Sequence, residues 1–264
     1  GVPVEVARVT GAGVVDPDEL AARVTEATAL VSVMLANNET GLLQPVREAA
    51  RVARERGALV HCDAVQAAGK VPLDVGALDV DLLTLSAHKI CGPKGTGCLW
   101  VRRGTPIVPL VRGGAQERNR RAGTENVAGI VGFGAAAAIA RRELAAEAPR
   151  IAAQRDRLLE RLLALPGAAA NGEGERLPNT ASVSFAGVEA EDLVIALDLE
   201  GIAASTGAAC AAGAALPSHV LRAMGLPPER VQSSLRLSLG RTTTDADVDR
   251  AGDVIAAVVA RLRR

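Results

Sequence analysis

The fold is decided by residues 58–89, which read ALVHCDAVQAAGKVPLDVGALDVDLLTLSAHK. Two short apolar runs in this stretch, Ala58 to Cys62 and Asp81 to Leu85, lack polar alternation and predict strands that are covered on both faces. Upstream, Ala29 to Leu35 predicts a third such strand, and Pro45 to Arg56 predicts the helix between them. The order β-α-β-α-β indicates an α/β domain with a mostly parallel sheet, right-handed crossovers and helices on both faces.

A smaller C-terminal α/β domain is expected after the first. An Ala-rich helical pattern runs from Thr124 to about Leu165 and is predicted to break near Pro149. We place the domain boundary near residue 143, which gives a large domain over 1–143 and a small domain over 144–264. The other predicted elements are a helix starting at Asp16-Pro17, strands at Gly97–Arg102, Thr180–Phe185, Ile202–Ala204 and Ser234–Leu239, a helix at Ala190–Leu199, and a final helix. An antiparallel direction stays open for the strand at Gly97–Arg102.

Composition excludes several classes of partner. The formal net charge is zero and no block of like charges occurs, which argues against nucleic acid or an anionic membrane and favours a small substrate. No apolar run approaches the roughly 20 residues of a membrane span, and no secretion signal is visible, so we expect a cytoplasmic protein. The four cysteines form no CxxC pair, which indicates free thiols and no metal site.

Polar side chains follow three of the predicted strands. The first strand is followed by Asn37-Asn38-Glu39-Thr40-Gly41, the second by Asp63-Ala64-Val65-Gln66 and the third by Ser86-Ala87-His88-Lys89. Each group alone is compatible with a turn, a helix cap or a solvated loop lysine. Because ligands of open parallel sheets bind beyond the carboxyl ends of the strands, the three together predict one site for an anionic, aromatic, carbonyl-bearing ligand.

Pyridoxal 5'-phosphate fits that description. The cofactor requires a lysine amine for its aldehyde, a carboxylate that keeps its ring nitrogen protonated, and donors for its phosphate. Lys89 and Asp63 supply the amine and the carboxylate. The glycines that follow Lys89 do not form the GxxxxGK[ST] pattern of a nucleotide-binding loop, and we interpret them as a tight turn into the next strand.

Five ordered motifs closely resemble the cysteine desulfurases that serve nitrogen fixation and iron-sulfur cluster assembly. These motifs are HCDAVQAAGK, SAHKICGPKGTG, GGAQERNRRAGTENV, STGAACAAG and SSLRLSLGR, and the similarity runs through nearly the whole chain. The resemblance implies a homodimer with the fold of type I pyridoxal enzymes. It further implies conversion of L-cysteine to L-alanine with a persulfide left on the enzyme.

The resemblance also implies roles position by position. Lys89 matches the lysine that binds the cofactor, and Asp63 matches the partner of the pyridine nitrogen. Arg236 matches the arginine that holds the substrate carboxylate, a role that suits a guanidinium because it donates two parallel hydrogen bonds. The remaining matches are Gln66 and Asn38 around the ring hydroxyl and the substrate, Ser86 and His88 at the phosphate, and Thr124 as a phosphate contact from the other subunit.

Cys210 matches the residue that takes up sulfur. It lies among alanines between Gly207 and Gly213, without bulky neighbours, so we expect a mobile thiol. A structural cysteine more often sits on a packed strand, as Cys62 is expected to do. The length of the segment before Pro217 resembles the family's longer-loop group, which hands sulfur directly to an iron-sulfur scaffold or another acceptor protein.

The resemblance begins about a hundred residues inside the family's sequence, judged from typical domain size. The family's N-terminal portion carries a phosphate-binding loop and a histidine that stacks on the cofactor ring, and we therefore expect this chain to be a fragment that binds the cofactor less tightly. Two alternatives stay open. One is another pyridoxal-dependent lyase or transaminase, such as a selenocysteine lyase, and the other is an inactive fragment that serves as an interaction module.

Overall fold

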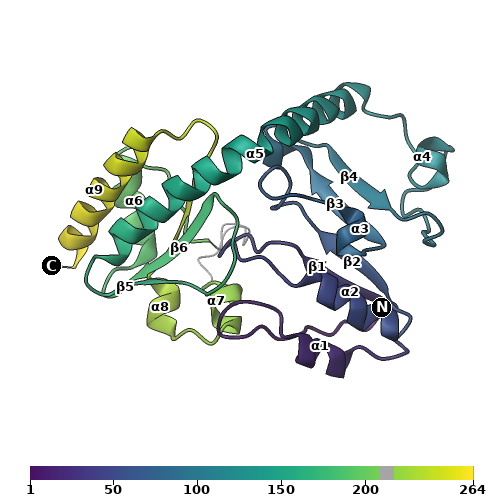
Figure 1. Cartoon of the computed structure of the whole chain (residues 1–264), viewed down its shortest axis with the longest axis horizontal. Coiled ribbons are helices and arrows are strands. Elements are labelled where there is room, and N and C mark those ends of the chain that lie inside the picture. Colours follow the sequence, from purple (N-terminus) through teal and green to yellow (C-terminus); the bar gives the residue numbers. More distant parts are fainter. Residues whose placement is uncertain (208–216, 264) are drawn as a thin grey trace.

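The computed structural model describes residues 1–207 and 217–263, which form two sheets joined by one long helix (Figure 1). The first part contains α1 (Pro17–Arg23), β1 (Leu30–Met34), α2 (Val46–Glu55), β2 (Leu59–Asp63), α3 (Val75–Leu78), β3 (Leu82–Ser86), the 3-10 helix η1 (Ala87–Ile90), β4 (Gly97–Val101) and α4 (Gln116–Asn119). The second part contains α5 (Val127–Leu163), β5 (Ala168–Ala170), β6 (Thr180–Phe185), α6 (Ala190–Leu199), α7 (His219–Ala223), α8 (Pro228–Gln232), β7 (Ser234–Ser238) and α9 (Asp245–Leu262).

The first sheet has the strand order β1-β2-β3-β4. β1, β2 and β3 are parallel, and β4 pairs with β3 in the antiparallel direction. Each of these strands begins and ends within one residue of the range predicted from the sequence. The predicted α/β class with a mostly parallel sheet is therefore confirmed.

One face of this sheet is packed against α2. The helix buries a face made mainly of small residues, including Ala49, Ala50 and Ala53, and these short side chains allow it to lie close to β1 and β2. Cys62 lies in the same core, fully buried beside Val33, its register neighbour on β1. The prediction that Cys62 is a packed strand cysteine is confirmed.

The opposite face of the first sheet is polar and partly exposed. Ser32 on β1, His61 on β2 and Thr84 on β3 lie on this face, because they alternate with the buried residues of their strands. Leu30 and Leu99 on the same face are each 47% exposed. Among the described residues the sheet has one closed apolar face and one open face that ends at the predicted ligand site. The expected mostly parallel sheet is formed, but the residues that the structure describes do not supply the expected cover of helices on both of its faces.

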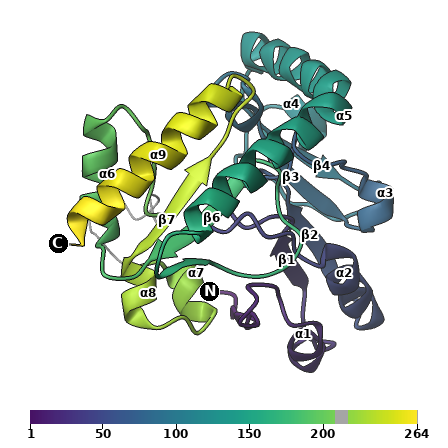
Figure 2. The ribbon, with the colours of Figure 1, turned by 60° about the vertical axis from the view of Figure 1, so that its left-hand side comes forward.

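The second sheet has the order β5-β6-β7 and is antiparallel throughout. β6 is buried along its whole length, and its apolar residues, among them Phe185, pack in one core with α5, α6 and α9. Figure 2 shows α9 lying alongside the second half of α5. This part forms the smaller α/β unit that the sequence predicts.

α5 is one continuous helix, so the predicted break near Pro149 is wrong. A proline removes one hydrogen bond to the carbonyl four residues earlier, which commonly kinks a helix. Here the residues that follow are held from outside the helix. Arg150 donates to the carbonyl of Thr243 at 3.0 Å, and Gln154 donates to Asp245 at 2.8 Å. The predicted domain boundary near residue 143 falls inside this helix.

The predicted short strand Ile202–Ala204 is also not formed. Only the next residue, Ser205, makes an isolated antiparallel bridge, to Arg236 on β7. Glycine and alanine neighbours provide too little side-chain contact to extend the pairing.

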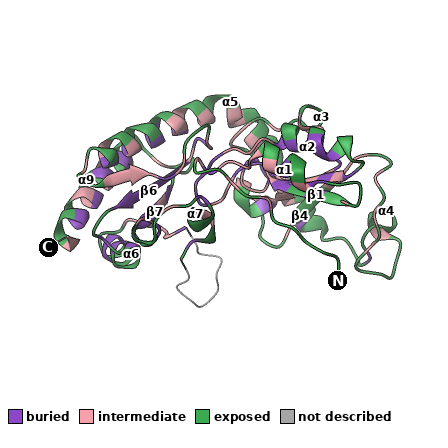
Figure 3. Ribbon diagram, turned by 90° about the horizontal axis from the view of Figure 1, so that it is seen from below, coloured by how far each residue is buried: buried purple, intermediate pink, exposed green. Residues whose placement is uncertain are grey.

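α5 has a largely exposed outer side, as Figure 3 shows. Its charged residues begin at Arg141, whereas residues 127–140 carry no charge. None of the helices formed by residues 1–207 and 217–263 is both long enough and apolar enough to cross a bilayer.

Candidate active site

The carboxyl ends of β1, β2 and β3 lie side by side. The register pairs Met34 with Asp63 and Asp63 with Thr84, so the segments that follow these three strands emerge at one edge of the sheet. This arrangement follows from parallel pairing, which gives neighbouring strands the same direction. The three polar groups predicted from the sequence are therefore neighbours in space.

The turn after β1 is fixed by Asn37. Its side-chain oxygen accepts hydrogen bonds from the backbone N–H groups of Glu39 at 2.8 Å and Thr40 at 3.0 Å. Gly41 closes the turn with a φ of 76°, and a Cβ added there would lie 2.7 Å from Cβ of Thr180 on β6. Glycine is required here both for its backbone conformation and for the close approach of the second sheet.

Arg236 reaches this turn from β7 in the second sheet. Its Nη1 donates to the carbonyl oxygen of Asn38 at 2.9 Å, which joins residues that are 198 positions apart. Its Nε is buried and has no hydrogen-bond partner among the described residues. A buried guanidinium N–H without an acceptor is costly, and it marks a place where an anionic group would be stabilised.

Asp63 lies at the end of β2 and is half-buried. One carboxylate oxygen accepts the backbone N–H of Val65 at 2.9 Å, a contact that orients the side chain locally. Gln66 directly follows Val65, and its backbone carbonyl accepts a hydrogen bond from the amine of Lys70 at 2.8 Å. Asp63 points to the open face of the sheet, because it alternates with the buried Cys62.

His61 is bound on the same face, two residues before Asp63. Its Nδ1 lies 2.7 Å from Oγ of Ser32, and its Nε2 lies 3.2 Å from Oγ1 of Thr84, so it links all three parallel strands. Partial burial lowers the pKa of His61, although the neighbouring Asp63 carboxylate acts in the opposite direction. Sequence reasoning gave His61 no role, yet its spacing from Asp63 already placed both on one face.

Ser86 and His88 meet at the end of β3. Ser86 Oγ lies 2.7 Å from His88 Nδ1, and His88 and Lys89 are exposed in the short helix η1. Ala87 and Gly92 close this segment through a backbone hydrogen bond of 2.8 Å. The glycines after Lys89 thus form the tight turn into β4 that the sequence predicts.

Lys70 is a further amine close to Lys89 that sequence reasoning did not single out. Burial lowers the pKa of Lys70 to about 8, and the positive charge of Lys89 adds to the effect. A partly buried lysine next to the candidate cofactor lysine has no simple sequence signal, because its burial depends on how the segment after β2 packs. Its position makes it part of the surroundings of Lys89.

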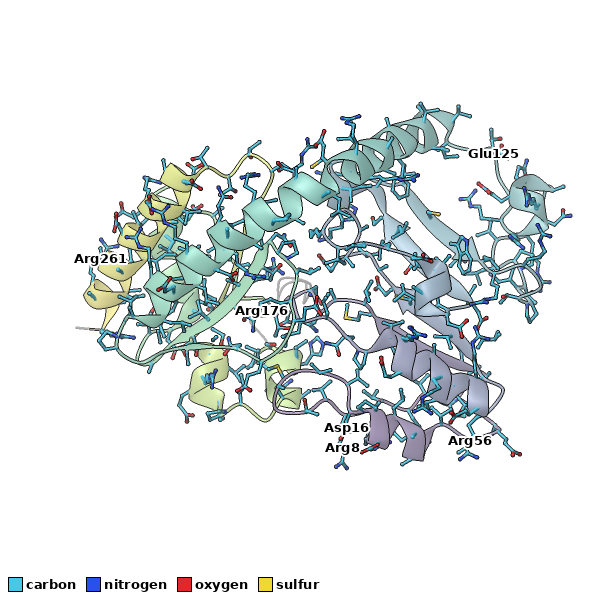
Figure 4. All side chains as sticks on the ribbon, in the orientation of Figure 1. Arg8, Asp16, Arg56, Glu125, Arg176 and Arg261 are labelled. Carbon is cyan, nitrogen blue, oxygen red and sulfur yellow. The ribbon has the colours of Figure 1, made fainter. Side chains whose placement is uncertain are left out.

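Thr124 is not brought to the strand ends by this chain. It is exposed and precedes the first residue of α5, Val127. The segment of η1 packs against α5 near Ala136. Ala136 lies nine residues after Val127, which corresponds to about 14 Å along the helix axis. Figure 4 shows Glu125, which follows Thr124, beyond the N-terminal end of α5 and far from Arg176.

The cysteines of the described residues differ in exposure. Burial raises the pKa of the Cys62 thiol to about 12, which makes it a poor nucleophile, and Cys91 and Cys98 are exposed. Cys210 lies outside the described residues. Its nearest described neighbours along the chain are Gly207 and Pro217. Ser218, which follows Pro217, donates a hydrogen bond to Glu39 in the turn after β1.

Comparison with known proteins identifies the family. The model of the aminotransferase class-V family matches residues 1–251. The chain belongs to this family. It is 49% identical over 252 residues to the cysteine desulfurase IscS of Methanosarcina thermophila, an alignment that covers 95% of this chain and 62% of that relative.

Two solved structures share the fold. A NifS-like protein superposes with a TM-score of 0.91 at 40% identity, and the match covers 99% of this chain and 69% of the other. SspA in complex with cysteine superposes with a TM-score of 0.75 at 29% identity, covering 90% of this chain and 67% of the other. The chain therefore spans a little over three fifths of the length of the curated relative and about two thirds of these solved chains.

Proposed function

We propose that this class-V chain is part of a pyridoxal-phosphate-dependent cysteine desulfurase. In this reaction L-cysteine becomes L-alanine, and its sulfur is taken up by Cys210 as a persulfide. One observation carries the proposal: Arg236 from the second sheet meets Asn38 at the strand ends that also present Asp63 and Lys89. The name cysteine desulfurase of the 49% identical relative supports the reaction type.

The residues present fit pyridoxal phosphate. Asp63 offers a half-buried carboxylate for the ring nitrogen, and Lys89 offers an exposed amine for the aldehyde. Ser86 and His88 form a hydroxyl–imidazole pair at the adjacent strand end, which suits a phosphate. We assign Gln66 and Asn38 to the ring hydroxyl and the substrate, as the family motif implies.

When bound, pyridoxal phosphate withdraws electrons and so stabilises negative charge at the substrate α-carbon. Asp63 keeps the proton on the ring nitrogen, because an adjacent carboxylate favours the charged form of a base. Lys89 Nζ would hold the cofactor through its aldehyde and would serve to hold and move the proton at the substrate α-carbon. Its position on a short helix directly after a rigid strand suits this role.

Arg236 orients the substrate. Its Nη1 is already held by the carbonyl of Asn38, which restricts the position of the guanidinium. A substrate carboxylate would accept charge-assisted hydrogen bonds from the guanidinium N–H groups that Asn38 does not occupy. Lysine cannot replace this planar geometry.

Sulfur uptake requires a thiolate, and a cysteine packed in the core does not readily provide one. The Cys62 thiol is buried and has a raised pKa, so it is unsuited to the chemistry. We therefore assign sulfur uptake to Cys210, which matches the family motif. Transfer onward to an iron-sulfur scaffold or another acceptor protein remains part of the proposal.

A homodimer is also part of the proposal. The exposed position of Thr124, far along α5 from η1, agrees with a phosphate contact that comes from a second subunit. The apolar residues Leu30 and Leu99 on the open sheet face also favour association with further polypeptide. The cytoplasmic location stays a prediction.

The test of the proposed function is a spectrum followed by an assay. Addition of excess pyridoxal phosphate is expected to give a yellow species that is lost in Lys89→Ala and kept in Cys210→Ala and in the matched control Lys94→Ala. L-Cysteine is then expected to yield L-alanine and a persulfide at Cys210. A colour that persists in Lys89→Ala contradicts the cofactor assignment, and alanine formation from L-selenocysteine alone contradicts the desulfurase reaction.

A further inference from the structure

Asn171 is a fully buried polar residue that the proposed chemistry leaves without a role. It lies directly after β5 and is 0% exposed. Its side-chain nitrogen donates to Oγ of Ser182 at 3.1 Å and to Oγ of Ser234 at 2.9 Å, and its side-chain oxygen accepts from Nε of Arg230 at 3.2 Å. The amide thus makes three of its four possible hydrogen bonds inside the chain. A buried amide is costly without such partners, so the partners indicate what Asn171 is for.

The two faces of β6 differ in character. The apolar residues Ala181, Val183 and Phe185 lie in the core that β6 shares with α5, α6 and α9. Ser182 and Ser184 alternate with them and therefore lie on the opposite face, where each is 3% exposed. Arg236 of the proposed site belongs to this polar face, because the register places it opposite Ser182 on the neighbouring strand.

Ser182 connects Asn171 to Arg236. Its hydroxyl accepts from the side chain of Asn171, and its backbone carbonyl accepts from the backbone N–H of the same residue at 2.9 Å. Directly opposed residues of an antiparallel pair have Cβ atoms about 4.5–5.5 Å apart, so the side chain of Arg236 leaves β7 beside Ser182. Asn171 thus fixes both the backbone and the side chain of the residue that lies next to the base of the arginine.

The rest of Arg236 is held by residues outside β6. Two backbone hydrogen bonds join it to Ser205, at 2.7 and 3.2 Å, and its Nη1 donates to the carbonyl of Asn38 at 2.9 Å. Apolar side chains of similar size would stabilise a sheet face as well as buried polar ones, whereas a hydrogen-bonded network fixes one arrangement. The polar network beside Arg236 therefore favours a role in setting the geometry of the arginine.

We propose that Asn171 is a positioning residue for Arg236, which acts through Ser182 to set the place from which the guanidinium reaches the carboxylate of an amino-acid substrate. This role rests on the proposed function, in which Arg236 binds that carboxylate. Asn171 itself does not touch the substrate.

The first test compares kinetic constants of the chain loaded with pyridoxal phosphate. Asn171→Ala and Ser182→Ala are each expected to raise KM for L-cysteine about 3- to 10-fold, the effect of losing about one hydrogen bond, with kcat within about threefold of the parent. The double variant is expected to match the weaker-binding single variant, because the two changes remove one interaction. Ser182→Thr keeps an acceptor for Asn171 and is expected to hold KM within about twofold of the parent.

The matched control is Ser184→Ala. Ser184 is as buried as Ser182 on the same face of the same strand, and its hydroxyl donates at 3.1 Å to the carbonyl of Ala169, but it lies opposite Ser234 and not opposite Arg236. The variant is expected to lose stability as Ser182→Ala does and to keep the KM of the parent. A KM for L-cysteine that rises equally in Ser184→Ala and Ser182→Ala overturns the proposal.

A pair of ligands tests whether the effect concerns the carboxylate. L-Alanine, the product of the proposed reaction, carries a carboxylate, and ethylamine is the same molecule without it. Binding of each to the loaded chain is followed through the change in the cofactor spectrum. Asn171→Ala and Ser182→Ala are expected to weaken binding of L-alanine about 3- to 10-fold and to leave binding of ethylamine unchanged. Equal weakening for both ligands contradicts positioning of Arg236.

A measurement without cofactor decides the matter if the parent shows neither reaction nor cofactor spectrum, an outcome that contradicts the proposed function alone. Phenylglyoxal modifies arginine side chains, and its rate at Arg236 is compared by peptide mass spectrometry with its rate at the exposed Arg103. The relative rate is expected to rise about threefold or more in Asn171→Ala and Ser182→Ala but not in Ser184→Ala. An unchanged rate in Ser182→Ala contradicts the proposal. If Asn171→Ala does not fold, Ser182→Ala, Ser182→Thr and Ser184→Ala decide the question.

Discussion

β2 and β6 are both central strands with polar residues on one side, but these polar side chains differ in burial and in hydrogen bonding. On β6 the polar side is buried, and its hydroxyls find partners within the chain: Asn171 donates to Ser182 at 3.1 Å, and Ser184 donates to the carbonyl of Ala169 at 3.1 Å. On β2 the polar side is partly exposed, and among residues 1–207 and 217–263 Asp63 has only a local backbone partner. Satisfied polar groups give a rigid platform, whereas available ones at a strand end serve a ligand.

The largest loss of stability around β6 is expected from a substitution at Phe185. Phe185→Ala is expected to lower the free energy of unfolding by about 3–5 kcal/mol, because a fully buried ring leaves a cavity. Leu30→Ala on the open face of the first sheet is expected to cost less than about 1.5 kcal/mol, since Leu30 is 47% exposed. Urea denaturation measures both. Equal losses would mean that the two sheets do not differ in packing as described.

The contact between the two regions is tested at Gly41. Gly41 and Gly57 have nearly the same φ, 76° and 75°, but only Gly41 approaches the second sheet, at Thr180. Gly57→Ala is expected to cost about 1–2 kcal/mol for the backbone conformation alone. Gly41→Ala is expected to cost about 1–3 kcal/mol more because it overpacks that contact. Similar denaturation midpoints for the two variants would show that the approach of β6 to the turn is not tight.

The strand-end region is expected to contain a destabilising charge, unlike the second sheet. The pKa of Lys70 is lowered from 10.5 to about 8, which corresponds to about 3 kcal/mol of unfavourable burial at pH 7. Lys70→Met removes this unfavourable free energy and also a hydrogen bond worth about 1 kcal/mol. The free energy of unfolding is therefore expected to rise by about 2 kcal/mol. The gain should shrink as the pH rises from 8 toward 10.5, because the unfolded lysine then loses its proton too. A Lys70→Met variant that is less stable than the parent at pH 7 contradicts the burial of a charge here.

The smallest expected effect is the pH dependence of the open face at His61. Burial lowers the pKa of His61, so the unfolded chain binds a proton more readily than the folded one. The contribution of neutral His61 to the free energy of unfolding is complete above the pKa of His61 in the unfolded chain, and it is lost as the pH falls through the pKa of His61 in the folded protein. Denaturation midpoints between pH 7.5 and pH 5 should therefore fall less steeply in His61→Gln than in the parent or in the exposed control His219→Gln. An identical slope in all three proteins would mean that His61 is not held neutral.

Much of the first sheet could be predicted because its signals are local. The apolar runs that became β1, β2 and β3 are short and unalternating, and the Asp16-Pro17 cap begins α1 as expected, with Asp16 accepting from the N–H groups of Asp18 and Glu19. The meeting of Asp63 with the ends of β1 and β3 followed from parallel order alone. Local propensity gave the wrong prediction at Pro149, where α5 is continuous and contacts with Thr243 and Asp245 hold the residues after the proline.

The sequence by itself determined the α/β class, the family motifs and the residue types that the chemistry requires at the three strand ends. Only the tertiary structure decided which distant residues meet: Arg236 with Asn38 across 198 positions, and Ser218 with Glu39 across 179. It also decided that His61 and Lys70 are partly buried and have lowered pKa values. The physical reason is that strand formation and capping depend on neighbours along the chain, whereas desolvation and long-range hydrogen bonds depend on the packing of one sheet against the other.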